Sequence, residues 1–147
     1  MVGGSREELN DLVKREIPTN VHCHGRVTQA QLTYYYKKFS IGLAPYTTNV
    51  GTPDGTNTSE YMSPLKIFEY MGWGKVVLAS DLPALREVLS DGSNALLLPP
   101  DDPLKWEDAL RSLSDQKFAT MLARTAYQDV IKSFSWDKRA AAILRLL

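Results

Sequence analysis

Ser63–Ser80 reads SPLKIFEYMGWGKVVLAS, and this stretch decides the fold. Ser63 followed by Pro64 is typical of the N-cap and first position of a helix, which we expect to run to about Gly72. Residues 75–80 (KVVLAS) have a continuous apolar centre, as a strand does when both of its faces are covered. The stretch therefore predicts a helix followed by a buried parallel strand.

The same alternation of short apolar runs and amphipathic segments continues on both sides of this stretch. We expect further strands over residues 20–27, 40–46 and 95–98. Helices are expected over residues 5–16, 28–39, 83–89 and 102–113, and from about 115 onward with a break at 133–137. The pattern predicts an α/β fold, a Rossmann-like three-layer domain with a mostly parallel sheet and C-terminal helices. Residues 1–147 are expected to form a single domain.

Composition excludes several classes of protein. The 147 residues are 44% apolar and 23% charged, as in ordinary globular domains. Seventeen Lys and Arg balance seventeen Asp and Glu, which argues against a nucleic-acid partner. No apolar run approaches the roughly 18 residues of a membrane span, and the first residues lack the apolar core of a signal peptide. Together with a single cysteine, Cys23, this predicts a cytoplasmic protein.

The start of the expected helix at Pro64 is the best candidate for a binding site. It follows a long polar loop, residues 47–60, and lies on the carboxyl side of a strand, where α/β sheets bind their ligands. The N–H groups of Leu65 and Lys66, with the Lys66 ammonium, suit an anion. The Glu69 carboxylate could accept hydrogen bonds from two hydroxyl groups. The alternative is an ordinary helix cap followed by a charged pair.

Residues 63–110 resemble the donor-binding half of family 4 retaining glycosyltransferases, which have the two-domain GT-B architecture. Further matches fall in the order of that family: Val2-Gly3-Gly4, Gly25-Arg26-Val27, SIGLAPY at 40–46, Asp91-Gly92 and Phe134-Ser135-Trp136. The resemblance extends through almost the whole chain. It implies a transferase that moves a sugar from a nucleotide diphosphate-sugar to an acceptor, with retention of the anomeric configuration. UDP is among the nucleotides to test. The resemblance also implies that the reaction needs no metal or other cofactor.

The resemblance also implies roles for individual residues. Glu69 matches a glutamate that binds the ribose hydroxyls. A second family glutamate, near the donor sugar, falls on Tyr61 here, with Glu60 one place out of register. The remaining matches imply that the diphosphate is bound at Ser63, Pro64, Leu65 and Lys66, and the base at Gly25, Arg26 and Val27.

The resemblance implies that the chain is part of a larger enzyme. The first strand of the domain is expected to be truncated, and the N-terminal acceptor domain to be missing. The isolated chain is then expected to bind a nucleotide-sugar donor and to be inactive in transfer. Further partners kept open are a membrane surface for the larger enzyme and a second copy of the chain, bound through the exposed interdomain face. The rival hypothesis is a non-catalytic nucleotide-binding or interaction module.

Two other clusters have plain structural explanations. His22-Cys23-His24 would place two histidines on one face of a strand, but a zinc site needs about four ligands, so packing is favoured and no metal is expected. Tyr34-Tyr35-Tyr36 would point in different directions on a helix, which favours packing over base stacking. A receiver-like signalling domain would need clustered acids after its first strand, and Gly3-Gly4 stands there instead.

Overall fold

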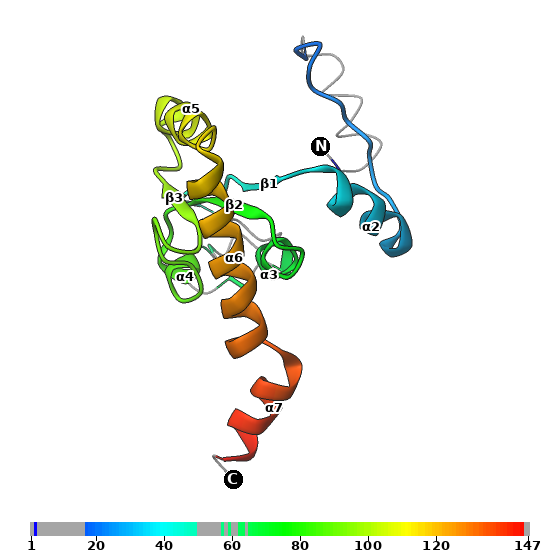
Figure 1. Ribbon diagram of the computed structural model, residues 1–147, viewed down its shortest axis with the longest axis vertical. Helices are drawn as coiled ribbons and strands as arrows, with labels where there is room; N and C mark the ends of the chain where they lie inside the picture. Colours follow the sequence, from blue (N-terminus) through cyan, green and yellow to red (C-terminus); the bar gives the residue numbers. More distant parts are fainter. Residues whose placement is uncertain are drawn as a thin grey trace. The chain divides into compact units, whose positions relative to one another are not determined.

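The computed structural model describes Val2, residues 17–49, Asn57, Ser59, residues 62–63 and residues 65–145. It divides into two compact units, one up to Lys38 and one from Phe39 onward, and each is treated by itself. The first unit contains helix α2 (Gln29–Lys38). The second contains, in order, β1 (Ile41–Ala44), α3 (Leu65–Gly72), β2 (Val76–Ser80), α4 (Pro83–Arg86), β3 (Leu96–Leu98), α5 (Pro103–Ser112), α6 (Gln116–Ser133) and α7 (Trp136–Leu144) (Figure 1).

The described strands form a parallel sheet in the order β1-β2-β3. Ile41 pairs with Val76 and Ala44 with Ala79, and on the other side Leu78 pairs with Leu96. Strand β2 is central, and all five of its residues are buried. Both pairings are parallel, which confirms the expected parallel sheet. Helix α3 or α4 lies in each connection, as connections between parallel strands require a long crossover.

Alternate residues of β2 belong to two hydrophobic clusters, one on each face of the sheet. Val77 and Ala79 pack with residues of α3, α4 and α6, whereas Val76 and Leu78 pack with residues of α5 and α6. Helix α6 reaches both clusters, with Ala126 and Val130 in the first and Leu122 in the second. The period of two in the strand thus produces the three layers of the predicted fold.

Polar side chains cap the starts of three of the described helices. Thr28 and Gln31 form a reciprocal capping box: Thr28 N–H donates to Gln31 Oε1 (2.9 Å) and Gln31 N–H to Thr28 Oγ1 (3.3 Å). The Asp102 carboxylate accepts from the Lys105 N–H (3.2 Å) at the start of α5. At the expected break after α6, Ser135 Oγ accepts from the Lys138 N–H (3.3 Å) and starts α7.

Two expectations about elements were wrong. Residues 20–27 form no strand, because Pro18 and Val21 close a turn (2.9 Å) and Gly25 takes a φ of 66°, which interrupts an extended chain. The helix expected over 83–89 ends at Arg86. The helix expected over residues 5–16 lies outside the described residues, and the single-domain division stays a prediction.

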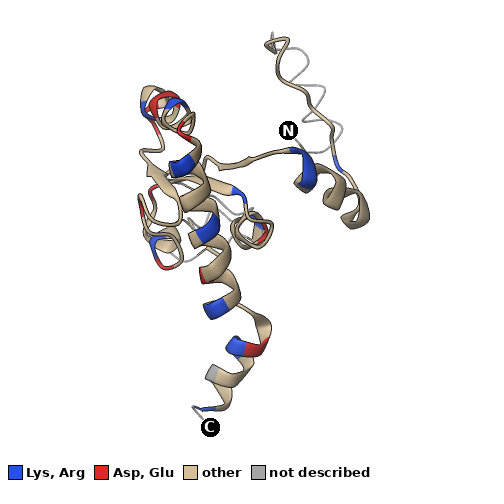
Figure 2. Cartoon of the chain, viewed as in Figure 1, with Lys and Arg blue, Asp and Glu red and all other residues tan. Residues whose placement is uncertain are grey.

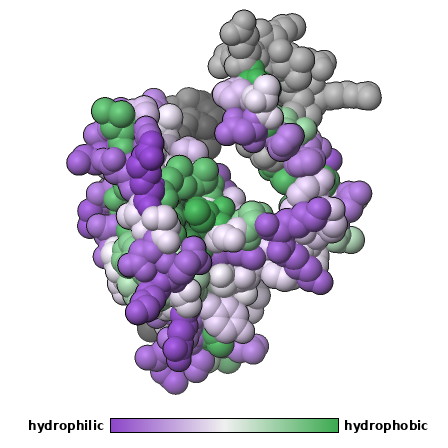
Figure 3. Space-filling model, turned by 45° about the horizontal axis from the view of Figure 1, so that its top comes forward, coloured by the Kyte–Doolittle hydropathy of each residue, from purple (hydrophilic) through white to green (hydrophobic). Residues whose placement is uncertain are grey.

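Charge is distributed over the second unit without a sharp division. Figure 2 shows Lys and Arg as well as Asp and Glu on the helices α5 to α7. In the face that Figure 3 shows, hydrophilic groups surround smaller apolar areas. Within the part of the chain that the structure describes, no helix is both long enough and apolar enough to cross a membrane.

Candidate functional site

Helix α3 starts at the carboxyl end of β1 and runs back along it. Lys66, in the first turn of α3, lies beside Tyr46, which follows the end of β1. Tyr70, one turn later, reaches the middle of the strand, where its hydroxyl donates to the Leu43 carbonyl (3.5 Å). The first turn of α3 therefore lies at the edge of the sheet where α/β proteins bind ligands.

A glycine in β1 permits the close approach of α3. A Cβ atom at Gly42 would lie 2.3 Å from Cδ2 of the Tyr70 ring. The ring therefore occupies the space that any larger residue at position 42 would need. Tyr70 also meets the Phe39 ring edge-on, with centroids 5.8 Å apart.

Ser80 fixes the backbone of Tyr46. The Tyr46 N–H donates to Ser80 Oγ (2.8 Å), and the Ser80 hydroxyl donates to the Tyr46 carbonyl (2.6 Å). Ser80 is the last residue of β2 and is 0% exposed. A single buried hydroxyl thus holds the segment after β1 against the end of β2.

The Lys66 ammonium lies over the face of the Tyr46 ring, 4.3 Å from its centroid. Burial lowers the pKa of Lys66. Burial, followed by the nearby Tyr70, raises the pKa of Tyr46 to about 12, so the phenol is neutral at physiological pH. A cation at a helix N-terminus is disfavoured by about 0.3–1 kcal/mol. A cation–π contact contributes about 0.5–2 kcal/mol, which is enough to offset that cost.

The first turn of α3 is suited to an anion. It contains no acidic residue, and its backbone N–H groups have no intrahelical acceptor. Leu65 is 71% exposed, so this turn is open to solvent. The N–H groups, the helix dipole and the Lys66 ammonium all favour negative charge at the same place.

Glu69 is half-buried in α3 and lies one helical turn after Leu65. Residues four apart lie on the same side of a helix, so Glu69 shares a side with the exposed Leu65. Its charge is also a secondary cause, after burial, of the raised pKa of Tyr70. The structure thus brings Leu65, Lys66 and Glu69 together on one short helix.

For the other predicted site residues, the structure gives only the burial of the side chain, or nothing where the residue lies outside the described part of the chain. Ser63 is exposed, whereas Glu60, Tyr61 and Pro64 lie outside the described residues. Gly25, Arg26 and Val27 belong to the first unit, where Gly25 is buried, Arg26 exposed and Val27 half-buried. The roles assigned to all of these residues stay predictions.

Two residues of this region escaped the sequence analysis: Tyr46 and Ser80. Each stands at or just after the carboxyl end of a predicted strand, SIGLAPY or KVVLAS. Strand ends are the positions that the general rule for α/β sheets marks. That rule could have identified both residues.

A second cation near this edge already has a carboxylate partner. Arg86, in α4, donates from Nε and Nη2 to the two oxygens of Asp81 (2.5 and 2.7 Å). Asp81 directly follows β2. Because the carboxylate neutralises the guanidinium, Lys66 is better suited to an anion than Arg86.

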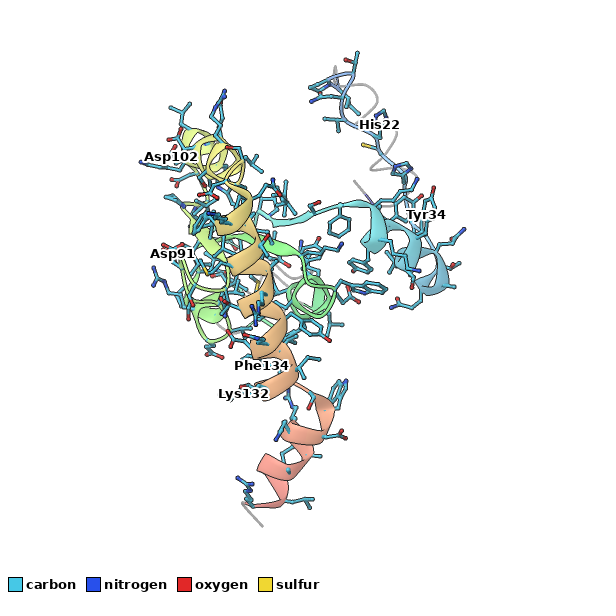
Figure 4. All side chains as sticks on the ribbon, viewed as in Figure 1. His22, Tyr34, Asp91, Asp102, Lys132 and Phe134 are labelled. Carbon is cyan, nitrogen blue, oxygen red and sulfur yellow. The ribbon has the colours of Figure 1, made fainter. Side chains whose placement is uncertain are left out.

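Other polar clusters lie elsewhere in the chain. Asn94 is buried and bridges Val88 and Asp129, with its Nδ2 2.8 Å from Asp129 Oδ2. His24 packs against Tyr35, with ring centroids 5.0 Å apart, and Figure 4 marks the neighbouring His22 and Tyr34. Among the described residues, no three His, Cys, Asp or Glu side chains gather closely enough to hold a metal ion.

Residues 1–116 match the model of the family described as "Glycosyl transferases group 1". The chain belongs to this family. No curated protein matches the sequence. The resemblance to group 1 glycosyltransferases found in the sequence is thereby confirmed.

Solved structures show the same fold. Sucrose-phosphate synthase from Thermosynechococcus elongatus matches with a TM-score of 0.73 at 24% identity, over 96% of this chain and 33% of that one. HepE from Anabaena, in complex with UDP, matches with a TM-score of 0.72 at 18% identity, over 99% and 40%. The C-terminal domain of LpcC, a group 1 family protein from Francisella tularensis, matches with a TM-score of 0.59 at 20% identity, over 88% and 62%. The chain thus spans less than two thirds of each of these structures.

Proposed function

We propose that the chain is the donor-binding half of a glycosyltransferase that uses a nucleotide diphosphate-sugar and transfers the sugar with retention. The observation that carries the proposal is the first turn of α3. This turn, with its free N–H groups and Lys66, lies at the carboxyl edge of the sheet, in a chain of the group 1 family. HepE has been solved with UDP and with UDP-glucose, which makes UDP the first nucleotide to test.

In this proposal the diphosphate binds at the start of α3, at Ser63, Pro64, Leu65 and Lys66. Negative charge develops on the diphosphate as the bond to the sugar breaks. The N–H groups of the helix and the Lys66 ammonium would stabilise that charge in the transition state. Glu69 would accept hydrogen bonds from the ribose hydroxyls. The contact of Gly25, Arg26 and Val27 with the base stays a prediction from the resemblance, because these residues belong to the first unit. No metal is assigned a role.

Titration calorimetry with UDP, GDP and ADP tests the binding site. We expect at least one nucleotide to bind with a Kd in the millimolar range or tighter. Lys66→Met and Glu69→Ala should weaken binding about tenfold, because each removes a charged hydrogen-bonding group. Lys75→Met is the matched control, because Lys75 precedes β2 at the opposite edge of the sheet. If none of the three nucleotides bound to the folded chain, the proposal would be wrong.

A transfer assay tests the proposed division of labour. The chain alone is expected to bind nucleotide and to transfer no sugar, because the acceptor site is assigned to another domain. Transfer from UDP-glucose to an acceptor mixture by the purified chain would contradict this. For a longer protein that contains this sequence, NMR of the product should show the anomeric configuration of the donor.

A further inference from the structure

We propose that Tyr46 is a positioning residue for nucleotide-sugar binding: its ring holds the Lys66 ammonium at the first turn of α3. This inference rests on the proposed function, since it concerns the same diphosphate site. Its basis is the contact of 4.3 Å between Lys66 Nζ and the centroid of the Tyr46 ring. In this role Tyr46 acts through Lys66.

The Tyr46 ring is anchored by the sheet. The Ser80 hydroxyl bonds to both the N–H and the carbonyl of Tyr46, at 2.8 and 2.6 Å. Ser80 ends the fully buried strand β2. The backbone from which the ring projects is therefore tied to the most buried strand described in this unit.

Lys66 needs such an anchor for two reasons. Its four-carbon side chain is flexible, and the ammonium can take many positions in water. The dipole of α3 also repels a cation from this end of the helix. The face of an aromatic ring attracts the ammonium and limits its positions before any ligand binds.

A neutral ring also leaves the positive charge available. Asp81 pairs with Arg86 and neutralises its charge, whereas the Tyr46 phenol carries none at neutral pH. An ammonium held on a ring keeps its attraction for a phosphate. The arrangement thus orders Lys66 in advance, and the binding of a diphosphate costs less conformational entropy.

The first test compares nucleotide affinity in four variants. Tyr46→Leu should raise the Kd for UDP about three- to tenfold, the range of a single cation–π contact. Tyr46→Phe keeps the ring and should stay within about twofold of the unchanged protein. In a Lys66→Met background, Tyr46→Leu should have no further effect, because the partner is gone. If UDP does not bind, GDP or ADP takes its place.

The second test observes the contact directly. The ring current of Tyr46 should shift the NMR signals of the Lys66 ε-methylene upfield in the unchanged protein and in Tyr46→Phe, and the shift should vanish in Tyr46→Leu. Phe39→Leu is the matched control, because it removes a ring that lies 5.5 Å from Lys75 Nζ at the amino end of the sheet. It should change neither the Lys66 signals nor the Kd.

The outcomes separate the two proposals. If no nucleotide binds the unchanged protein, the proposed function fails, and the role of Tyr46 in binding fails with it. If nucleotide binds and Lys66→Met weakens binding, but Tyr46→Leu does not, the positioning role alone is wrong. An equal loss from Tyr46→Leu with and without Lys66 would also overturn it, since the effect would then be a general one on structure.

Discussion

At the scale of single residues, the contact between β1 and α3 depends on the missing side chain at Gly42. Gly42→Ala places a Cβ 2.3 Å from Cδ2 of the Tyr70 ring, so the ring or the helix must move. We expect a loss of about 1–3 kcal/mol in the free energy of unfolding, as for other overpacked cores. Urea denaturation followed by circular dichroism measures it.

Gly72→Ala is the control for this substitution, because a Cβ there meets nothing within 4 Å. Its effect should be neutral or slightly stabilising, since alanine favours a helix. The double variant Gly42→Ala, Tyr70→Leu should regain part of the loss, because leucine leaves more room. Equal stability of Gly42→Ala and the unchanged protein would show that the strand and helix separate without cost.

Tyr46 gives the stability a dependence on pH at the alkaline end. Its pKa is raised from 10.0 to about 12, first by burial, so the folded state favours the neutral phenol. The contribution of the neutral Tyr46 phenol to the free energy of unfolding is fully present below pH 10. It is lost as the pH rises toward 12, where the phenol ionises even in the folded state. Tyr46→Phe should flatten this part of the curve. Urea midpoints from pH 8 to 11.5 measure it, and an unchanged slope would contradict the assignment.

At the scale of whole elements, α6 contributes more to the stability of the second unit than its neighbour α7. Asp115 caps α6 by accepting from the N–H groups of Lys117 (2.9 Å) and Phe118 (3.3 Å). Helix α6 also supplies buried residues to both core clusters. Phe134, just after this helix and labelled in Figure 4, packs on Phe68 of α3 with ring centroids 5.6 Å apart. The Asp115 cap therefore supports the helix that contributes to both hydrophobic clusters.

Asp115→Ala should cost about 1 kcal/mol of unfolding free energy, within the usual range of about 0.5–2 kcal/mol for a lost N-cap. Asp115→Asn should cost less, because the amide oxygen still accepts. Ser135→Ala removes the cap of α7, which has no buried residue among those described, so it should change global unfolding little. A larger loss from Ser135→Ala than from Asp115→Ala would reverse this ranking of the two helices.

Sequence patterns predicted the elements whose signals are local. Helices α2 and α5 begin with capping residues that are close together in the sequence, Thr28 with Gln31 and Asp102 with Pro103. An unbroken apolar run predicts β2. The expected strand at 20–27 was wrong because alternation alone does not supply a pairing partner, and Gly25 adopts a positive φ. A local sequence pattern predicts neither the pairing partner of a strand nor the backbone conformation of Gly25.

Only part of the candidate site could be predicted from the sequence, because only that part depends on local pattern. Leu65, Lys66 and Glu69 follow one another on a single helix, so a helical pattern places them together. Tyr46 and Ser80 are far apart in sequence and meet only because Ile41 pairs with Val76, which sets the register of β1 on β2. A single sequence carries no direct signal for that register.

At the scale of the whole second unit, stability should be unequal along the chain. All five residues of β2 are buried between two layers, whereas α7 exposes Trp136 to 81% and Leu144 to 70%. Backbone amides exchange at a rate set by the smallest opening that exposes them. Amides of Val76–Ser80 should therefore exchange only on global unfolding, and those of Trp136–Leu144 through local fraying.

Hydrogen exchange measured by mass spectrometry distinguishes these two regimes. The protection of β2 should fall with urea at the slope of global unfolding, while that of α7 should be weak and nearly independent of urea. Asp115→Ala should lower the protection of β2 by about the amount that it lowers the unfolding free energy, and leave α7 almost unchanged. Protection of α7 as strong as that of β2 would contradict this ranking, and if that protection fell on dilution, a second copy of the chain would be what covers the apolar side chains of α7.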